Sequence, residues 1–387
     1  MRVAAALACW LGLQSSAAAS ESAGIDISAS MAQKLRALVQ KHPERDERQL
    51  LKIGDSQTVS PGFLQCFADP PASIGHALFA RSSLLRTSRA AKEGQVVHWV
   101  LGDPLRAELK ENRGRYAVVM FGTNDVQNAP TGGMRSFAYE MAQLGDALVR
   151  HGVIPLFTSP PPRPLRPVDQ SHFGVAGAGP WVPRYAAIVR GIAKGRQWPF
   201  LDLESALNVL PDAGLMRDGV HLRAGANGAC DFSEEGMQSG HNVRNWLTMR
   251  ALEFTAGVVR GSNAGLKSDK LVQANAGTAA TPVSVDEWPY TDLGRGASMH
   301  GSALCSSGSK ERVYELTLKQ RAHLRATVFT LGAAPIFMHF RDKQSGQCTP
   351  LSRLEWIADA EAGTYQWVVS TPAKGPAGDY LITVLSE

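Results

Sequence analysis

Residues 116–125 read Tyr-Ala-Val-Val-Met-Phe-Gly-Thr-Asn-Asp, a near-continuous apolar run that stops at a glycine followed by polar residues. Such a run is typical of a strand buried on both faces, as the strands of parallel sheets are. A shorter run of the same form lies at residues 50–56, Leu-Leu-Lys-Ile-Gly-Asp-Ser. Both runs place polar side chains directly after a strand, where the functional loops of open α/β sheets lie.

The segments around these two runs alternate between strand and helix patterns. Further strands are predicted at residues 153–157 and 199–203, with a weaker one at 83–87. Helical spacing of apolar residues predicts a helix over 134–150, and further helices are predicted over 104–112, 182–193 and 242–254. This alternation predicts an α/β fold, a three-layer sandwich whose mostly parallel sheet is covered on both faces.

The texture of the chain changes after this region. Residues 261–283 are small, polar and aperiodic, which is typical of a linker. Apolar residues then alternate with polar ones, for example in 314–318 and 365–369, with glycines between the runs. We therefore expect a small all-β sandwich over residues 284–387, separate from a first domain over 20–260.

Composition excludes several classes of protein. The 387 residues are 44% hydrophobic and 19% charged, as in ordinary globular proteins, and the net charge of +5 is spread along the chain. The sequence has no basic stripe interleaved with aromatic residues, the pattern that would favour nucleic-acid binding. No apolar run after the N-terminal segment is long enough to span a membrane. None of the histidines and cysteines shows the spacing of a metal site, so no metal or other cofactor is expected.

The N-terminus has the pattern of a secretory signal peptide. Arg2 precedes an apolar stretch, and Ala17-Ala18-Ala19 forms a small-residue cleavage site, so residues 1–19 are assigned to the signal and the mature protein to a secreted or periplasmic location. Removing Cys9 leaves four cysteines in an oxidising compartment, which allow three pairings in principle. The positions along the chain favour Cys66 with Cys230, at one end of the sheet, and Cys305 with Cys348, inside the second domain.

Ser56 follows a strand and a glycine, which predicts an exposed hydroxyl at a strand-to-helix turn. The alternative is that Ser56 only caps the next helix. Asn124 follows the most buried-looking strand, and its amide is suited to donate to a developing oxyanion. Asp218 stands three residues before His221, a spacing that lets a carboxylate orient an imidazole while the other ring nitrogen faces a nucleophile. Together these residues predict acyl-transfer chemistry.

These motifs, in this order, resemble the SGNH (GDSL-type) hydrolase superfamily, whose fold is a flavodoxin-like sandwich. The resemblance covers roughly residues 49–254 and implies that Ser56 is the nucleophile, His221 the base and Asp218 its partner, with Asn124 in the oxyanion hole. The family's backbone oxyanion donor, a glycine, is assigned to Gly94, with Gly75 and Gly102 as rivals. The proline that commonly follows the histidine is replaced by Leu222.

The C-terminal segment resembles a bacterial pre-peptidase C-terminal domain in residues 312–316, 362–365 and 378–384, and a generic accessory sandwich fits these residues nearly as well. The sequence as a whole predicts an exported serine esterase that acts on a carboxylic ester, with O-acetyl groups on carbohydrate as one candidate and no cofactor. One alternative is an acyltransferase that uses the same site. Another is a surface carbohydrate-binding or adhesion protein whose chemistry has lapsed, with the accessory domain contacting a surface or polymer.

Overall fold

The computed structural model describes residues 25–69, 78–164, 178–267, 281–283, 290–294, 304–305, 310–349, 354–372 and 378–386. The expected signal segment and one rival glycine, Gly75, lie outside these residues. The chain divides into two compact units. The first holds Met1–Pro130, Leu144–Pro183 and Gln197–Asp269, and the second holds Thr131–Gln143, Arg184–Arg196 and Lys270–Glu387.

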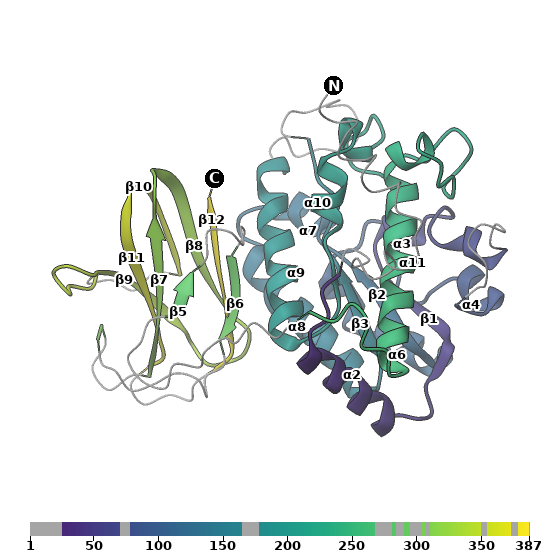
Figure 1. Cartoon of the computed structure of the whole chain (residues 1–387), viewed down its shortest axis with the longest axis horizontal. Coiled ribbons are helices and arrows are strands. Elements are labelled where there is room, and N and C mark those ends of the chain that lie inside the picture. The colour runs from purple at the N-terminus through teal and green to yellow at the C-terminus, as the bar shows by residue number, and fades with distance from the viewer. Residues whose placement is uncertain are drawn as a thin grey trace. The chain divides into compact units, whose positions relative to one another are not determined.

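The first unit is built on a parallel sheet (Figure 1). Among the described residues its strands are β1 (Asp46–Gly54), β2 (Gly114–Met120), β3 (Ile154–Thr158) and β4 (Phe200–Leu201), in that spatial order. Every residue of β2 is buried, as the apolar run at 116–121 predicts. Because the strands are parallel, the loops that follow β1, β2 and β3 all leave the sheet at its carboxyl end.

Helices flank this sheet, so the predicted α/β sandwich is confirmed. Leu35 of α2 and Leu252 of α11 share one hydrophobic core with Val118 and Met120 of β2. The described helices of the whole chain, of which most of α9 and the first part of α8 fall in the second unit, are α2 (Ala29–Lys41), α3 (Ser56–Val59), α4 (Arg81–Leu85), α5 (Val97–Val100), α6 (Asp103–Glu111), α7 (Thr123–Asn128), α8 (Met134–Arg150), α9 (Val182–Arg196), α10 (Leu203–Asn208) and α11 (Gly240–Val259). Short 3-10 turns lie at Gln65–Ala68, Gly179–Trp181, Pro211–Gly214 and Gly236–Gln238.

The strand predicted at residues 83–87 is wrong, because this stretch forms the helix α4 and its C-terminal flank. Side-chain hydrogen bonds instead join β1 to this helix. The hydroxyl of Ser83 accepts from the backbone N–H of Leu50 (2.8 Å), and Lys52 Nζ donates to the carbonyl of Leu84 (2.9 Å). Only a single-residue bridge, between Gly54 and Ala91, extends the parallel pairing on this side among the described residues.

The second unit contains the predicted all-β sandwich. Its described strands are β5 (Thr281–Val283), β6 (Tyr290–Gly294), β7 (Glu311–Leu318), β8 (Ala322–Thr330), β9 (Phe337–Asp342), β10 (Glu355–Ala360), β11 (Gly363–Ser370) and β12 (Tyr380–Ser386). They form sheets of order β10-β8-β12-β6 and β5-β7-β11-β9, antiparallel except at the β5–β7 pair. Trp367 is fully buried in the core, and the hydroxyls of Tyr314 and Tyr380 meet at 2.8 Å across the two sheets.

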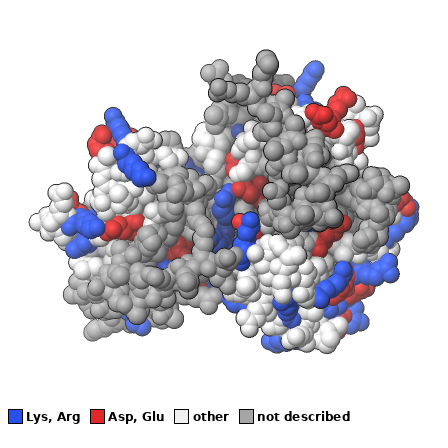
Figure 2. Space-filling model, in the orientation of Figure 1, with Lys and Arg blue, Asp and Glu red and all other residues white. Residues whose placement is uncertain are grey.

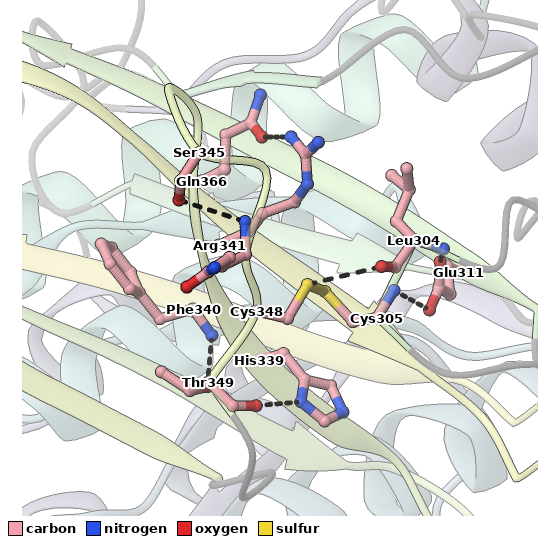
Figure 3. Close-up of a disulfide and its surroundings, with 11 residues drawn as sticks. Leu304, Cys305, Glu311, His339, Phe340, Arg341, Ser345, Cys348, Thr349 and Gln366 are labelled. Carbon is pink, nitrogen blue, oxygen red and sulfur yellow. Dashed lines mark hydrogen bonds between the residues drawn. A yellow bond between two sulfur atoms is a disulfide. The ribbon is translucent and has the colours of Figure 1, made fainter.

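A disulfide joins Cys305 to Cys348 in this sandwich, as the sequence predicts (Figure 3). Beside it, the buried carboxylate of Glu311 accepts from the backbone N–H groups of Leu304 (2.6 Å) and Cys305 (3.0 Å). The bridge therefore holds the segment before β7 against the turn that comes after β9. The sandwich has the expected form, and its resemblance to the pre-peptidase C-terminal domain stays a prediction.

The helix α9 belongs with the sandwich although it lies between β3 and β4 in the chain. Gly191 and Gly195 are one helical turn apart and meet the strands closely. A Cβ atom added at Gly191 would lie 2.5 Å from Leu381 Cδ1, and one added at Gly195 would overlap Leu293. Arg196 pairs with Asp379 at 2.8 Å. Small residues on α9 thus allow β6 and β12 to approach its backbone within the second unit.

On the face shown in Figure 2, acidic and basic side chains lie among one another. Among the ion pairs of the described residues, Arg86 and Arg89 both pair with Glu111. No helix in the described part of the chain is long and apolar enough to cross a membrane.

Candidate active site

The turn after β1 carries Ser56 as the first residue of α3. Gly54 is required there, because an added Cβ would lie 2.5 Å from the carbonyl oxygen of Met120 on the neighbouring strand. Asp55 caps α3, and its Oδ1 accepts from the backbone N–H of Gln57 at 3.1 Å. Since the capping role belongs to Asp55, the hydroxyl of Ser56 is free to point elsewhere.

The loop before α11 brings His221 to this hydroxyl. Ser56 Oγ lies 3.2 Å from His221 Nε2, and His221 Nδ1 lies 2.7 Å from Asp218 Oδ2. The other oxygen of Asp218 accepts from the backbone N–H groups of Val220 (2.9 Å) and His221 (3.0 Å). One carboxylate thus shapes the loop and orients the imidazole, as the three-residue spacing predicts.

The charged form of Asp218 is favoured by these contacts. Partial burial raises the pKa of this carboxyl, but hydrogen bonds from the His221 ring and from two backbone N–H groups outweigh it and leave the pKa below its ordinary value. A carboxylate that stays ionised holds the Nδ1 proton of His221, so Nε2 carries the lone pair that faces Ser56.

The segments around Gly94 and Asn124 are bound to each other. Asn124 Nδ2 donates to the carbonyl of Gln95 (3.1 Å), and Asp125 Oδ1 accepts from the backbone N–H of Val97 (3.0 Å). Gly94 has φ +72° and open space around a would-be Cβ, so backbone conformation rather than room favours glycine there. The rival Gly102 is the residue that precedes α6 and has φ −91°.

Asp55 and Asp125, which are next in sequence to Ser56 and Asn124, are buried carboxyl groups. Asp55 is fully buried, and burial raises its pKa to about 6 although Arg244 and a backbone hydrogen bond oppose this. Burial raises the pKa of Asp125 to about 7, with a contribution from Asp55, while the N–H groups of Val97 and Gly122 lower it. Both pKa values are displaced because the charged forms lose water that few partners replace.

The segment after the nucleophile is fixed to the loop after the base. Cys66 and Cys230 form the predicted disulfide, with Cα atoms 6.0 Å apart. The buried Asn245 of α11 accepts from the N–H of Leu64 (3.0 Å) and donates to the carbonyl of Ala229 (2.7 Å). Leu64 has φ +62°, a conformation that costs free energy in a non-glycine residue and that these contacts hold in place.

Sequence reasoning missed several residues around this site. Arg244 is fully buried, its guanidinium lies 3.7 Å from the centroid of the Phe63 ring, and it donates to the carbonyl of Gln57. Burial lowers the pKa of Arg244 to about 9, although Asp55 opposes this. Arg163, which follows β3, donates to the carbonyl of Thr123. No local signal marks Arg244, because the same helix also contains His241, Asn242, Asn245 and a second arginine, Arg250.

Residues 53–227 match the GDSL-like Lipase/Acylhydrolase family, a range that includes Ser56, Gly94, Asn124, Asp218 and His221. A parallel sheet flanked by helices, together with this match, defines a class, the α/β enzymes that hydrolyse esters. The match is narrower, and it shows that the chain contains a GDSL-like lipase/acylhydrolase domain. It is a carboxylic ester hydrolase. No curated protein matches the chain significantly.

Several solved structures are similar to part of the chain. A lipase/acylhydrolase from Enterococcus faecalis is 18% identical, with a TM-score of 0.38, and the match covers 55% of this chain and 96% of that one. A GDSL-like lipase from Bacteroides thetaiotaomicron is 16% identical, with a TM-score of 0.38 and coverage of 58% and 98%. An acetylxylan esterase from Geobacillus stearothermophilus is 16% identical, with a TM-score of 0.37 and coverage of 54% and 95%.

Proposed function

We propose that this chain is an exported serine esterase in which Ser56, His221 and Asp218 form the catalytic triad. The observation that carries the proposal is the continuous pair of contacts, Ser56 Oγ to His221 Nε2 at 3.2 Å and His221 Nδ1 to Asp218 Oδ2 at 2.7 Å. Both distances are within the range for a nucleophile, its base and an orienting carboxylate. Export is supported by the signal-like N-terminus and by two disulfides.

In this reaction Ser56 Oγ attacks the ester carbonyl carbon while His221 Nε2 takes the hydroxyl proton. The oxygen of the tetrahedral intermediate accepts from the backbone N–H groups of Ser56 and Gly94 and from the amide of Asn124. The C–O bond to the alcohol breaks, and His221 returns its proton to the leaving oxygen. A water molecule then loses a proton to His221, attacks the acyl-enzyme and releases the acid, and Ser56 recovers its proton.

Asn124 is suited to this role through its position rather than its charge. One of its amide hydrogens is used on the carbonyl of Gln95, which fixes the side chain, and the second hydrogen is available to a substrate oxygen. Asp125 supports the same turn, since its Oδ2 accepts from the backbone N–H of Gly122 at 3.0 Å. An oxyanion donor held in advance needs no reorganisation during the reaction.

The substrate class that we propose to test first is O-acetyl groups on carbohydrate. Esters of increasing acyl length and acetylated polysaccharides should be compared for kcat/KM. Release of acid without an added acceptor supports hydrolysis, whereas faster turnover and a new ester upon addition of sugar alcohols would favour the acyltransferase alternative.

The decisive experiment is labelling with a fluorophosphonate, which reacts with an activated serine. The wild-type protein should be labelled, and Ser56→Ala should lose both labelling and ester turnover. Ser60→Ala is the matched control, because Ser60 lies at the other end of α3. Full turnover in a folded Ser56→Ala variant would exclude Ser56 as the nucleophile.

A further inference from the structure

Gln57 is the residue after the proposed nucleophile, and it is 1% exposed. The family is named after a Gly-Asp-Ser-Leu motif, and this chain has Gln where the motif has Leu. A buried amide is costly unless its donors and acceptors are bonded. The hydrogen-bond partners of Gln57 therefore indicate the role of a glutamine at this position.

The side chain of Gln57 contacts the backbone on both sides of His221. Its Nε2 donates to the carbonyl of Val220 at 2.7 Å, and its Oε1 accepts from the N–H of Leu222 in a longer hydrogen bond of 3.4 Å. Because these two residues flank the histidine, one amide restrains both ends of the short segment that carries the imidazole.

The backbone of Gln57 is fixed as well. Its N–H donates to Asp55 Oδ1 (3.1 Å), and its carbonyl accepts from Arg244 Nη1. Arg244 also donates to Thr58 Oγ1 (3.3 Å), and the guanidinium is fully buried. A side chain attached to a backbone held in this way transmits the position of the Ser56 turn to the loop of His221.

We infer that Gln57 is a positioning residue that sets the distance between Ser56 and His221, which rests on the proposed function. The two triad residues come from segments 165 positions apart in the chain. The hydrogen bond between Ser56 and His221 is a contact between reacting groups and is broken in each turnover. The contacts of Gln57 take no part in the bond changes, so they hold the geometry throughout the cycle.

The test compares Gln57→Met and Gln57→Leu with the wild-type protein. Both variants remove the bonds to Val220 and Leu222 and replace the amide by an apolar side chain of similar or smaller size. We expect kcat and the rate constant of fluorophosphonate labelling to fall together by about 10–100-fold, since a shift of about 1 Å in a reacting group costs up to 10²-fold. KM for a small ester should change less than about threefold, because the loss concerns the chemical step.

The matched control is Gln366→Met. Gln366 is a buried glutamine of β11 whose side chain accepts from Arg341 (2.6 Å) and donates to Glu315 (2.6 Å). This variant likewise removes one accepted and one donated side-chain hydrogen bond, in the second unit. It should lower the melting temperature and leave kcat and the labelling rate unchanged.

The outcomes separate this inference from the proposed function. Wild-type kcat and labelling in a folded Gln57→Met or Gln57→Leu variant overturn the inference, and so does a failure of both variants to fold, which would make Gln57 a purely structural residue. Retained labelling in Ser56→Ala overturns the proposed function itself. Loss of labelling in Ser56→Ala with full activity in the Gln57 variants overturns only the role of Gln57.

Discussion

Arg163 donates a hydrogen bond of 3.0 Å to the carbonyl of Thr123, the residue that precedes Asn124. Its other terminal nitrogen donates to Gln127 Oε1 at 2.8 Å. One guanidinium thus contacts both the beginning and the end of α7, the helix that carries Asn124. Burial lowers the pKa of Arg163, while Asp55 and Asp218 raise it, so the group remains a cation near the carboxylates of the site.

Replacing Arg163 should reduce turnover through α7. We expect Arg163→Met to lower kcat by about tenfold with a smaller change in KM, because Asn124 loses part of its support. Arg163→Lys should restore little, since an ammonium does not reproduce the two-pronged contact. Steady-state kinetics on a small ester, with circular dichroism to verify folding, measures both effects. An unchanged kcat in Arg163→Met would show that α7 holds its position without this contact.

Asn124→Ala should lower kcat by about 10²–10³, the usual cost of one oxyanion donor. Ser56 and His221 stay in contact in this variant, so slow fluorophosphonate labelling should persist. The exposed Asn128, at the other end of α7, provides the control, and Asn128→Ala should keep wild-type kinetics. If the two variants behave alike, Asn124 is not an oxyanion donor.

Asp55→Asn should change how stability depends on pH. Burial raises the pKa of Asp55 to about 6 in the folded protein, so the native state binds this proton more tightly than the unfolded chain. The contribution of Asp55 to the free energy of unfolding therefore decreases as pH rises from about 4 to about 6. Asparagine does not titrate, so the variant should gain stability relative to wild type across this interval.

Thermal unfolding between pH 4.5 and 8.5 measures this difference. Asp69→Asn is the control, because Asp69 is 75% exposed and a change there should shift the curves by a small amount at every pH. Parallel melting curves for wild type and Asp55→Asn across the interval would mean that Asp55 is ionised in the folded protein throughout.

Removing the Cys66–Cys230 disulfide should destabilise the first unit by about 2–4 kcal/mol. This bridge closes a segment of 164 positions, against 43 for Cys305–Cys348, so its loss should cost about 1 kcal/mol more on the chain-entropy account. The double variants Cys66→Ser/Cys230→Ser and Cys305→Ser/Cys348→Ser can be compared by denaturant unfolding. A larger effect from the second pair would contradict this ranking.

The sequence predicted those elements whose burial is visible in the local pattern of apolar and polar residues. Strands such as β2 are apolar throughout because both faces are buried, and the positions of Ser56 and Asn124 follow from the strands that precede them. The spacing of Asp218 and His221 is local, so their contact needs no knowledge of the rest of the fold.

The remaining features depend on partners that are distant in the chain. Leu84 and Leu85 make residues 83–87 a strand candidate in the sequence, but residues 83–85 are helical and Ser83 bonds to the edge of β1 through its side chain. Gln57 and Arg244 are 187 positions apart, and the sequence around either residue does not indicate that the two are hydrogen-bonded. The role of a buried polar side chain depends on the group to which it bonds, so only the folded structure identifies that role.

The helix α9 has a consequence for the order in which the molecule is completed. Asp379 follows its partner Arg196 by 183 positions, and Gly191 meets Leu381 of the last strand. During synthesis α9 is made well before β6 and β12. The contacts between this helix and these two strands therefore form only after the strands have been made. The glycine face of α9 is covered only after Leu381 has been made, so the folding of the second unit cannot be completed before then.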